Sequence, residues 1–322
     1  MESRFTRRSF LTVVGAGAGT ACGLFGKASQ PATPVNFAVP AHACDCHTHI
    51  FGDPAKFPFF AGRTYTPETA LPEEMARMHA ALHIERVVIV TPSVYGTDNS
   101  CTLYGMKARG ANARAIAVID EKTPATELER LRAAGFRGLR LNLATAGQTD
   151  AATARRRLQN AIVQAKGVGW HIQMFTSLAV IAGIRDLVMD SDVPVVFDHF
   201  GGTIAASGLK QPGFNDLLEL LRAGKAYVKV SGAYRASSRG QDYSDVTPFA
   251  QAMIGANADR VLWGSDWPHP DTAIVAGRKA TDIAPLLPID DGRLLNQLAV
   301  WAPDAAVRHK ILVDNPARLY GF

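Results

Sequence analysis

Two histidines and an aspartate lie close together in the segment Asp45-Cys46-His47-Thr48-His49. Alternation along an extended strand would put Asp45, His47 and His49 on one face, with the two histidines toward its C-terminal end. Two imidazoles at this spacing can bind one divalent metal ion or one substrate oxygen. Paired core or surface histidines show the same spacing, so the motif indicates a site only if other groups converge on it.

A third histidine follows an apolar run that ends at Asp198-His199. Titratable residues at the end of such a run are costly unless they are paired or face a polar cavity. His199 is therefore a candidate metal ligand or oxyanion stabiliser, with Asp198 as its partner. A loop histidine capped by Asp198 is the structural alternative.

A carboxylate ends a later apolar run, Trp263-Gly264-Ser265-Asp266-Trp267. Its position between two tryptophans predicts a raised pKa for Asp266, which would suit it for proton transfer. His269, between two prolines, is expected to be a loop residue that shapes the pocket.

These segments belong to a regular alternation of β-branched runs and helical patterns from residue 36 to residue 322, which is typical of βα units. The eight predicted strands are 43–50, 86–93, 114–120, 136–143, 170–175, 194–200, 227–231 and 261–266. Helical segments between them include 73–82, 126–134, 152–166, 181–190, 214–223 and 246–254, with a weaker one within 94–112. The pattern predicts a single-domain (β/α)₈ TIM barrel, whose catalytic groups lie at the C-terminal ends of the strands. A doubly wound sheet is the alternative, but no Gly-rich dinucleotide motif follows the first strand.

On such a barrel, four side chains from the first, sixth and eighth strands meet at the active face. They are His47, His49, His199 and Asp266. His171 begins the fifth strand at the opposite end, and we expect it to be structural. Asn142 and Phe175 occupy the tops of the middle strands, which argues against a second, bridged metal. His79 has no partner at ligand spacing and is expected on the surface or on a helix.

A second set of residues could recognise the substrate. Arg140 lies near the end of the fourth strand, Ser93 ends the second, and Arg235 follows the seventh. An arginine that faces into a barrel needs an anion, and a guanidinium binds a carboxylate with two hydrogen bonds. Tyr65, after the first strand, could close over the pocket. For Arg140, an ion pair with Asp198 is the structural alternative.

The charge of the chain is concentrated at its N-terminus. The formal net charge is +5 and the pI is about 9.1. Four basic residues against one acidic residue give residues 1–35 a charge of +3, which leaves +2 for the rest. A nearly balanced body carries no electrostatic signature of nucleic-acid binding.

The N-terminal segment resembles a twin-arginine (Tat) export signal. Arg7 and Arg8 precede a small-residue, weakly apolar run of roughly 14 residues, shorter than the ~20 that span a bilayer. We therefore expect a signal peptide and linker over residues 1–35, a barrel over residues 36–322, contact with the Tat export machinery, and an exported or periplasmic location. A disordered basic arm or an interfacial helix is the alternative.

The body resembles the amidohydrolase superfamily, specifically the branch typified by 2-pyrone-4,6-dicarboxylate lactonase, over nearly all of residues 36–322. The motifs that carry the resemblance are Asp45-Cys-His-Thr-His-Ile-Phe-Gly52, Tyr95-Gly-Thr-Asp-Asn99, Gly135-Phe-Arg-Gly-Leu-Arg-Leu-Asn142, Phe197-Asp-His199, Val230-Ser-Gly-Ala-Tyr-Arg235, Leu262-Trp-Gly-Ser-Asp-Trp-Pro-His269 and Asp314-Asn-Pro-Ala-Arg-Leu-Tyr-Gly-Phe322. The resemblance implies hydrolysis of a small carboxylated lactone, with Asp266 activating water. It also implies that the histidines surround the carbonyl and that Ser93, Arg140 and Arg235 hold carboxylates.

The resemblance leaves the metal open, because the superfamily includes both metal-independent enzymes and enzymes with one Zn²⁺ or another divalent ion. The ligands of such an ion would be His47, His49, His199 and Asp266. Oligomer formation is likewise left open.

The sequence departs from the pyrone-dicarboxylate pattern at two places. An arginine expected after the fourth strand and a tyrosine expected on the fifth are replaced by Ala144-Thr-Ala-Gly147 and Phe175. Their loss weakens recognition of a second carboxylate, so a muconolactone, a sulfomuconolactone or a sugar-acid lactone is an equal candidate. A metal-dependent decarboxylase, a sugar-acid lactone isomerase and an exported binding protein for organic acids are the alternative functions.

Overall fold

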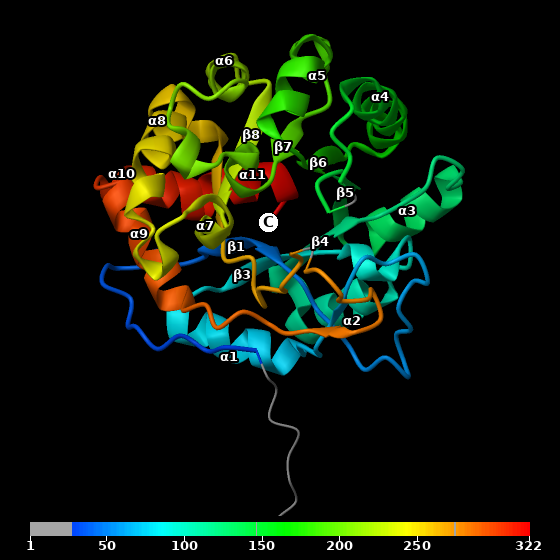
Figure 1. Ribbon diagram of the computed structural model, residues 1–322. Helices are drawn as coiled ribbons and strands as arrows, with labels where there is room; N and C mark the ends of the chain where they lie inside the picture. The colour runs from blue at the N-terminus through cyan, green and yellow to red at the C-terminus, as the bar shows by residue number, and fades with distance from the viewer. Residues whose placement is uncertain (1–27, 146, 274) are drawn as a thin grey trace, which may run out of the picture.

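The computed structural model describes residues 28–145, 147–273 and 275–322 (Figure 1). Within these residues, eight parallel strands form one sheet in the order β1-β3-β4-β5-β6-β7-β8-β9. They are β1 (Cys44–Thr48), β3 (Arg86–Val90), β4 (Ala113–Ala117), β5 (Phe136–Asn142), β6 (His171–Phe175), β7 (Val195–Phe197), β8 (Ala226–Ser231) and β9 (Val261–Gly264). The predicted (β/α)₈ barrel is confirmed for the described residues, and most strands end earlier than predicted.

Helices connect the strands and surround the sheet (Figure 1). They are α1 (Pro72–Leu82), α2 (Ser100–Arg109), α3 (Ala125–Ala133), α4 (Ala151–Val168), α5 (Leu178–Asp190), α6 (Phe214–Arg222), α7 (Ala233–Ala236), α8 (Thr247–Asn257), α9 (Asp291–Trp301), α10 (Ala305–His309) and α11 (Asn315–Tyr320). Local sequence sets their ends. Helix α4 begins after Asp150, whose carboxylate accepts hydrogen bonds from the backbone of Ala152 and Thr153, and ends at Gly169 in the left-handed region.

Both faces of the strands are covered, which explains their continuous apolar runs. Strand β3 illustrates the pattern. Val88 and Val90 belong to the cluster inside the barrel, whereas Val87 and Ile89 pack in the outer layer with helix residues. The barrel therefore has a central core and a surrounding one, and polar groups inside it need specific partners.

The barrel closes where β1 meets the chain just after β9. The backbone of Asp266 donates to the carbonyl of His47 at 2.9 Å, and that of His49 donates to the carbonyl of Trp267 at 2.8 Å. Gly264 permits this approach, because a Cβ at that position would lie 2.8 Å from the Cβ of His47. The closure therefore falls on residues that the sequence singled out as a site.

Strand β1 is irregular, and the prediction that Asp45 shares a face with His47 and His49 is wrong. The register against β3 shifts just after Asp45. Cys46 packs inside the barrel, whereas the Asp45 carboxylate lies 3.2 Å from Nε2 of His79 on α1. The irregularity turns the strand so that His47 faces the interior, as β-bulges commonly do beside active sites.

Residues 1–27 of the predicted signal peptide and linker over residues 1–35 lie outside the described residues, and the signal peptide stays a prediction. The following residues contact the barrel: Thr33 donates to the Asp290 carboxylate, and the backbone of Asn36 donates to Asn296 at 2.8 Å. Among the residues that the structure describes, no helix combines the length and apolarity needed to cross a membrane.

Candidate active site

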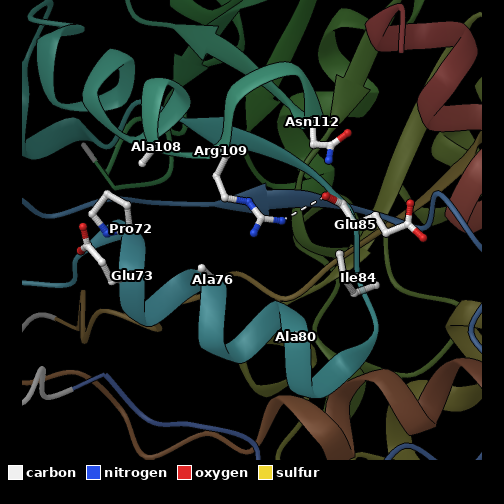
Figure 2. A pocket seen from close by; sticks show the side chains of 9 residues that line it. All are labelled: Pro72, Glu73, Ala76, Ala80, Ile84, Glu85, Ala108, Arg109 and Asn112. Carbon is white, nitrogen blue, oxygen red and sulfur yellow. Dashed lines mark hydrogen bonds between the residues drawn. The ribbon is translucent and has the colours of Figure 1, made fainter.

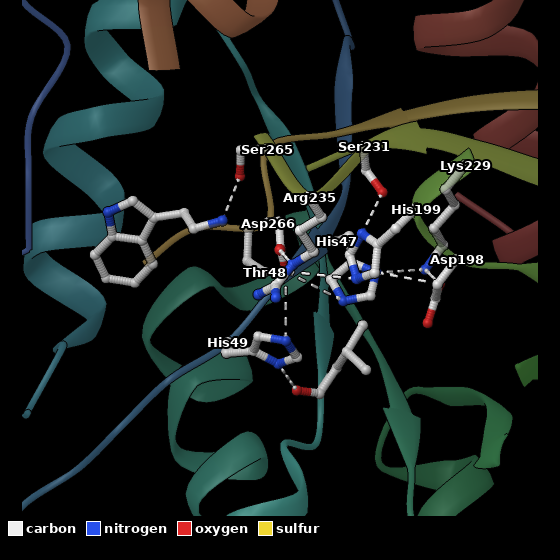
Figure 3. Close-up of polar contacts among 12 residues, drawn as sticks. His47, Thr48, His49, Asp198, His199, Lys229, Ser231, Arg235, Ser265 and Asp266 are labelled. Atoms are coloured by element: carbon white, nitrogen blue, oxygen red, sulfur yellow. Dashed lines mark hydrogen bonds and ion pairs between the residues drawn. The ribbon is translucent and has the colours of Figure 1, made fainter. Parts of the chain in front are cut away.

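Three histidine rings surround one oxygen of Asp266 (Figure 3). The Nε2 atoms of His47 and His49 each lie 3.7 Å from Oδ1 of Asp266, and that of His199 lies 3.8 Å away. His47 and Asp266 are fully buried, and His49 and His199 are each 4% exposed. The structure thus brings together all four predicted residues, which we call the histidine–aspartate cluster.

Backbone geometry at the strand ends places these side chains. His199 and Asp266 have φ values of 49° and 68°, in the left-handed region that non-glycine residues seldom adopt. Gly232, which follows β8, has a φ of 57°, and a Cβ there would lie 3.0 Å from Nδ1 of His199 and 3.1 Å from Oδ2 of Asp266. A side chain at position 232 would therefore push into the cluster.

A specific partner holds the far side of each ring. Nδ1 of His49 lies 2.7 Å from the carbonyl oxygen of Val90. Nδ1 of His199 lies 3.0 Å from the Ser231 hydroxyl. Nδ1 of His47 instead faces the buried pair of Lys229 and Asp198 described below. These contacts fix the rings so that their Nε2 atoms converge.

The second oxygen of Asp266 is held from outside the cluster. Oδ2 accepts hydrogen bonds from the Tyr234 hydroxyl at 2.7 Å and from Nε of Arg235 at 2.6 Å. Burial alone would raise the pKa of Asp266, but Arg235 and the three histidines hold that pKa well below its usual value. The predicted rise is therefore wrong, because Arg235 and the surrounding imidazoles outweigh the effect of burial.

The histidines of the cluster are neutral at ordinary pH. Burial lowers the pKa of His49 to about 3 and that of His199 to about 4. Burial also lowers the pKa of His47 well below its usual value. A neutral imidazole offers one lone pair and one N–H group. The three rings can therefore bind a metal or hydrogen-bond to a substrate oxygen.

The cluster contains candidate ligands for one divalent metal ion. His49 uses Nδ1–H toward the Val90 carbonyl, so its Nε2 lone pair faces the lone pairs of Asp266 Oδ1. Nε2 of His47 and Oδ1 of Asp266 have no hydrogen-bond partner in the described part of the chain. Three imidazole nitrogens and one carboxylate oxygen form a donor set that Zn²⁺ accepts, and the ligand atoms of His47, His49 and Asp266 all lie within 4.8 Å of one another.

The cluster borders a small cavity at the C-terminal ends of the strands. Its lining residues are His49, Tyr65, Ser93, Arg140, Asn142, Thr145, Phe175, His199, Arg235, Asp266, Pro270 and Thr272. All four predicted substrate-binding residues, Tyr65, Ser93, Arg140 and Arg235, are therefore part of this wall. Arg140 is 6% exposed, and its Nη1 donates to the carbonyl of Thr91 at 3.1 Å.

The cavity is small. Its free volume is about 20 Å³, which accommodates about one water molecule. Two loops meet next to Tyr65 in its wall, because β2 (Thr66–Pro67) pairs with β10 (Ile283–Ala284). The Thr66 hydroxyl also donates to the carbonyl of Ala280 at 2.7 Å. A ring-sized molecule is larger than this free volume.

A larger cavity, of about 420 Å³, lies on the outside of the barrel between α1 and α2 (Figure 2). Its wall includes Pro72, Ala76 and Ala80 of α1 and Arg109 of α2, whose guanidinium donates to the carbonyl of Glu85. The residues that line it do not include the cluster or the predicted substrate-binding residues.

Two other histidines have buried carboxylate partners. His269 lies in a loop, as expected, and is fully buried, with its Nε2 3.1 Å from Oδ1 of Asp291; the described residues that line the cavity do not include it. His79 lies on helix α1, one of the two predicted locations, and is buried with its Nε2 3.2 Å from Oδ2 of Asp45. Their carboxylate partners are distant in the sequence, so spacing could not reveal them.

Lys229 and Gln173 are among the polar residues near the cluster that were not predicted from the sequence. Both are fully buried inside the barrel. Oδ2 of Asp198 accepts a hydrogen bond from Nε2 of Gln173 at 3.0 Å, and Nζ of Lys229 lies 3.3 Å from Oδ1 of Asp198. The sequence does contain a signal for this group, because Lys229 interrupts the otherwise mostly apolar strand β8. A buried charge of this kind needs a buried partner.

Comparison with known proteins places this chain among enzymes that act on lactones. A family model described as Amidohydrolase matches residues 44–322. The chain is 37% identical to 4-sulfomuconolactone hydrolase of Rhizobium radiobacter over 89% of this chain and 93% of the relative. It is 32% identical to 2-pyrone-4,6-dicarboxylate hydrolase of Comamonas testosteroni, over 91% of this chain and 94% of the relative. It is also 30% identical to D-galactarolactone isomerase of Agrobacterium fabrum, over 89% and 94% respectively.

Proposed function

The chain belongs to the amidohydrolase family, and from that membership we propose that it hydrolyses a small carboxylated lactone. The observation that carries the proposal is the convergence of three neutral histidines on Asp266 beside the buried guanidinium of Arg140. The relatives named for lactone hydrolysis support the substrate class.

Asp266 is the proposed proton acceptor. Its Oδ2 is occupied by Tyr234 and Arg235, whereas its Oδ1 faces the cluster. A water molecule beside Oδ1 would lose its proton to that oxygen as it attacks the ring carbonyl. The same carboxyl group would then deliver the proton to the ring oxygen as the ester bond breaks. The low pKa of Asp266 keeps it ionised before the reaction, so the proton-accepting form is the resting one.

The histidines would stabilise the oxyanion, which is usually the largest electrostatic contribution to such a reaction. Those whose Nε2 carries a proton can donate a hydrogen bond to the developing negative charge. A divalent ion held by His47, His49, His199 and Asp266 would supply Lewis-acid polarisation of the carbonyl when bound.

The cavity wall favours an acidic substrate. Its lining includes the cations Arg140 and Arg235, the hydroxyl groups of Tyr65 and Ser93, and the uncharged Asn142 and Phe175. A carboxylate or sulfonate suits the guanidinium of Arg140, since that of Arg235 already pairs with Asp266, and the planar ring of a lactone suits Phe175. We therefore favour a muconolactone, a sulfomuconolactone or a sugar-acid lactone over the pyrone dicarboxylate.

A lactone panel tests the proposal. Muconolactone, 4-sulfomuconolactone, 2-pyrone-4,6-dicarboxylate and D-galactarolactone would be incubated with the protein before and after chelator treatment, and acid release followed in a pH-stat. We expect acid release, at least one proton per ring opened, with at least one lactone of the panel. Absence of acid release across the panel, with the wild type folded by circular dichroism, would reject lactone hydrolysis.

Isomerisation of a sugar-acid lactone is the second candidate, because a relative at 30% identity is a D-galactarolactone isomerase. The two reactions share the proton acceptor but differ in product. Isomerisation releases no acid and gives a product of unchanged mass, whereas hydrolysis adds one water. Mass spectrometry on the same panel separates them, and carbon dioxide release would instead indicate a decarboxylase.

Export through the Tat route is a separate proposal that rests on Arg7 and Arg8. Replacing both with lysine is expected to retain the protein in the cytoplasm of a bacterium with a Tat system. Western blots of periplasmic and cytoplasmic fractions would measure this. Equal export of the lysine variant would contradict the proposal.

A further inference from the structure

A buried ammonium group lies inside the barrel next to the histidine–aspartate cluster (Figure 3). Nζ of Lys229, on β8, lies 2.6 Å from Oε1 of Gln173, 3.3 Å from Oδ1 of Asp198 and 3.2 Å from Nδ1 of His47. Lys229, Gln173 and Asp198 are fully buried. An ammonium group at full burial survives only with partners of this kind, and one of these partners belongs to the cluster.

Nδ1 of His47 has two neighbours that require opposite hydrogen-bonding roles from it. Lys229 can only donate a hydrogen bond and ionised Asp198 can only accept one, and both lie 3.2 Å away. The contact with Lys229 has hydrogen-bond geometry. Oδ1 of Asp198 lies 3.3 Å from the ammonium group of Lys229, and Oδ2 of that carboxylate accepts a hydrogen bond from Gln173.

The neighbour of Nδ1 decides which nitrogen of a neutral imidazole carries the proton. For His49 the neighbour is the Val90 carbonyl, which only accepts, so Nδ1 is protonated and Nε2 carries a lone pair. For His47 the hydrogen bond comes from Lys229, so Nδ1 carries the lone pair and Nε2 is protonated. For His199 the neighbour is the Ser231 hydroxyl, which accommodates either form.

We propose that Lys229 is a positioning residue that keeps the proton of His47 on Nε2, so that this ring donates a hydrogen bond into the pocket and the cluster binds divalent metal weakly. His47 and His49 then have complementary roles although both leave the same strand. To ligate a metal, His47 must move its proton to Nδ1 and donate to Asp198. Lys229 disfavours that form, because its ammonium group would then face an N–H group.

Replacing Lys229 with methionine tests the proposal without any substrate. Zn²⁺ affinity would be measured by competition with a chromogenic chelator, on protein stripped of metal. We expect the affinity of Lys229→Met to exceed that of the wild type by about 10–100-fold, the range that partners behind metal ligands usually contribute. The half-buried Lys225, whose Nζ donates to the carbonyl of Ser191, provides the control. Lys225→Met should bind Zn²⁺ like the wild type.

Nitrogen-15 NMR of the metal-free protein reads the tautomer directly. The wild type should show His47 protonated at Nε2 and His49 protonated at Nδ1, with assignments made by His47→Gln and His49→Gln. In Lys229→Met the His47 proton should move to Nδ1. A wild-type spectrum with His47 protonated at Nδ1 would overturn the proposal, as would an unchanged zinc affinity in Lys229→Met.

A second variant keeps the test meaningful if Lys229→Met fails to fold, since that change leaves Asp198 buried without its cation. Lys229→Met combined with Asp198→Asn removes both charges and keeps an amide oxygen that can accept from Nδ1–H of His47. The double variant should show the same gain in zinc affinity as Lys229→Met. If the double variant folds but binds Zn²⁺ no more tightly than the wild type, the proposal is contradicted. This proposal rests on the proposed function in one respect, namely that the substrate's lactone carbonyl lies beside Nε2 of His47. Zinc affinity and NMR are both measured without turnover. Failure of the lactone panel and failure of this test are therefore distinguishable.

Discussion

Two groups of buried histidines and aspartates lie near the closure of the barrel, and they are built differently. In the histidine–aspartate cluster, three Nε2 atoms share one oxygen of Asp266 at 3.7–3.8 Å and border a cavity. In the second group, each histidine has its own carboxylate. His269 lies 3.1 Å from Asp291, and His79 lies 3.2 Å from Asp45. We call these two contacts the paired histidines.

The difference shows that burial and residue type do not by themselves mark a reactive site. All the side chains of the paired histidines and their carboxylates are fully buried, as in the cluster. What distinguishes the cluster is convergence on one atom together with access to a cavity. A carboxylate next to a single histidine forms a buried pair within the fold, whereas an oxygen that faces three imidazole nitrogens beside a cavity is available for chemistry.

Replacing Asp266 with asparagine is expected to have the largest effect. Asparagine keeps the shape but cannot accept a proton, so the rate of ring opening should fall by roughly 10²–10⁴-fold, measured as kcat/KM in the pH-stat. The matched control is Asp291→Asn, a buried aspartate of the paired histidines, which should keep kcat/KM within about twofold. Equal losses in both folded variants would remove the proposed distinction between the two groups.

Replacing His269 with leucine should affect stability rather than chemistry. The change leaves Asp291 buried without its partner, which costs about 3 kcal/mol or more in the free energy of unfolding. Urea denaturation measures the loss. The kcat of the remaining folded protein should equal that of the wild type, and a selective fall in kcat would place His269 in the reaction.

Replacing Arg140 with methionine should weaken substrate binding. The guanidinium lines the cavity, and losing its interaction with an acidic group should raise KM by roughly 10–100-fold with a smaller change in kcat. An esterified lactone provides the control, because it lacks the negative charge and should show little difference between wild type and variant. Equal losses on both substrates would indicate a structural role for Arg140.

The pH dependence of stability provides the smallest of these effects and concerns Asp291. Burial raises the pKa of Asp291 above its usual value. An acid with a raised folded pKa binds its proton more readily when folded, so the wild type should gain stability over Asp291→Asn as the pH falls through that pKa toward 3.8. Urea denaturation at several pH values measures the gap, and a gap that narrows on acidification would contradict this assignment.

The barrel and the cluster were predictable from the sequence for one physical reason. Parallel strands must be apolar on both faces, so polar residues at their ends stand out. Once His47, His199 and Asp266 are placed on the strands of a barrel, their meeting follows from the topology. The resemblance to amidohydrolases is confirmed by the family match over residues 44–322.

The missed features depend on contacts that no local pattern encodes. The register shift in β1 separates Asp45 from the histidines, although strict alternation would group them. The pKa of Asp266 depends on Arg235, 31 residues away, rather than on the neighbouring tryptophans. Lys229 contacts His47 although the two residues are 182 positions apart in the sequence. Each outcome required the positions of side chains from separate strands.

The closure of the barrel also determines when the site can exist during synthesis. Asp45 accepts a hydrogen bond from the backbone of Ser265, across 220 residues, and the backbone hydrogen bonds that link His47 to Asp266 lie beside it. A ribosome-bound chain that has not yet released its eighth strand lacks Asp266 and therefore any complete cluster. The complete cluster therefore forms only once the two ends of the sheet have met.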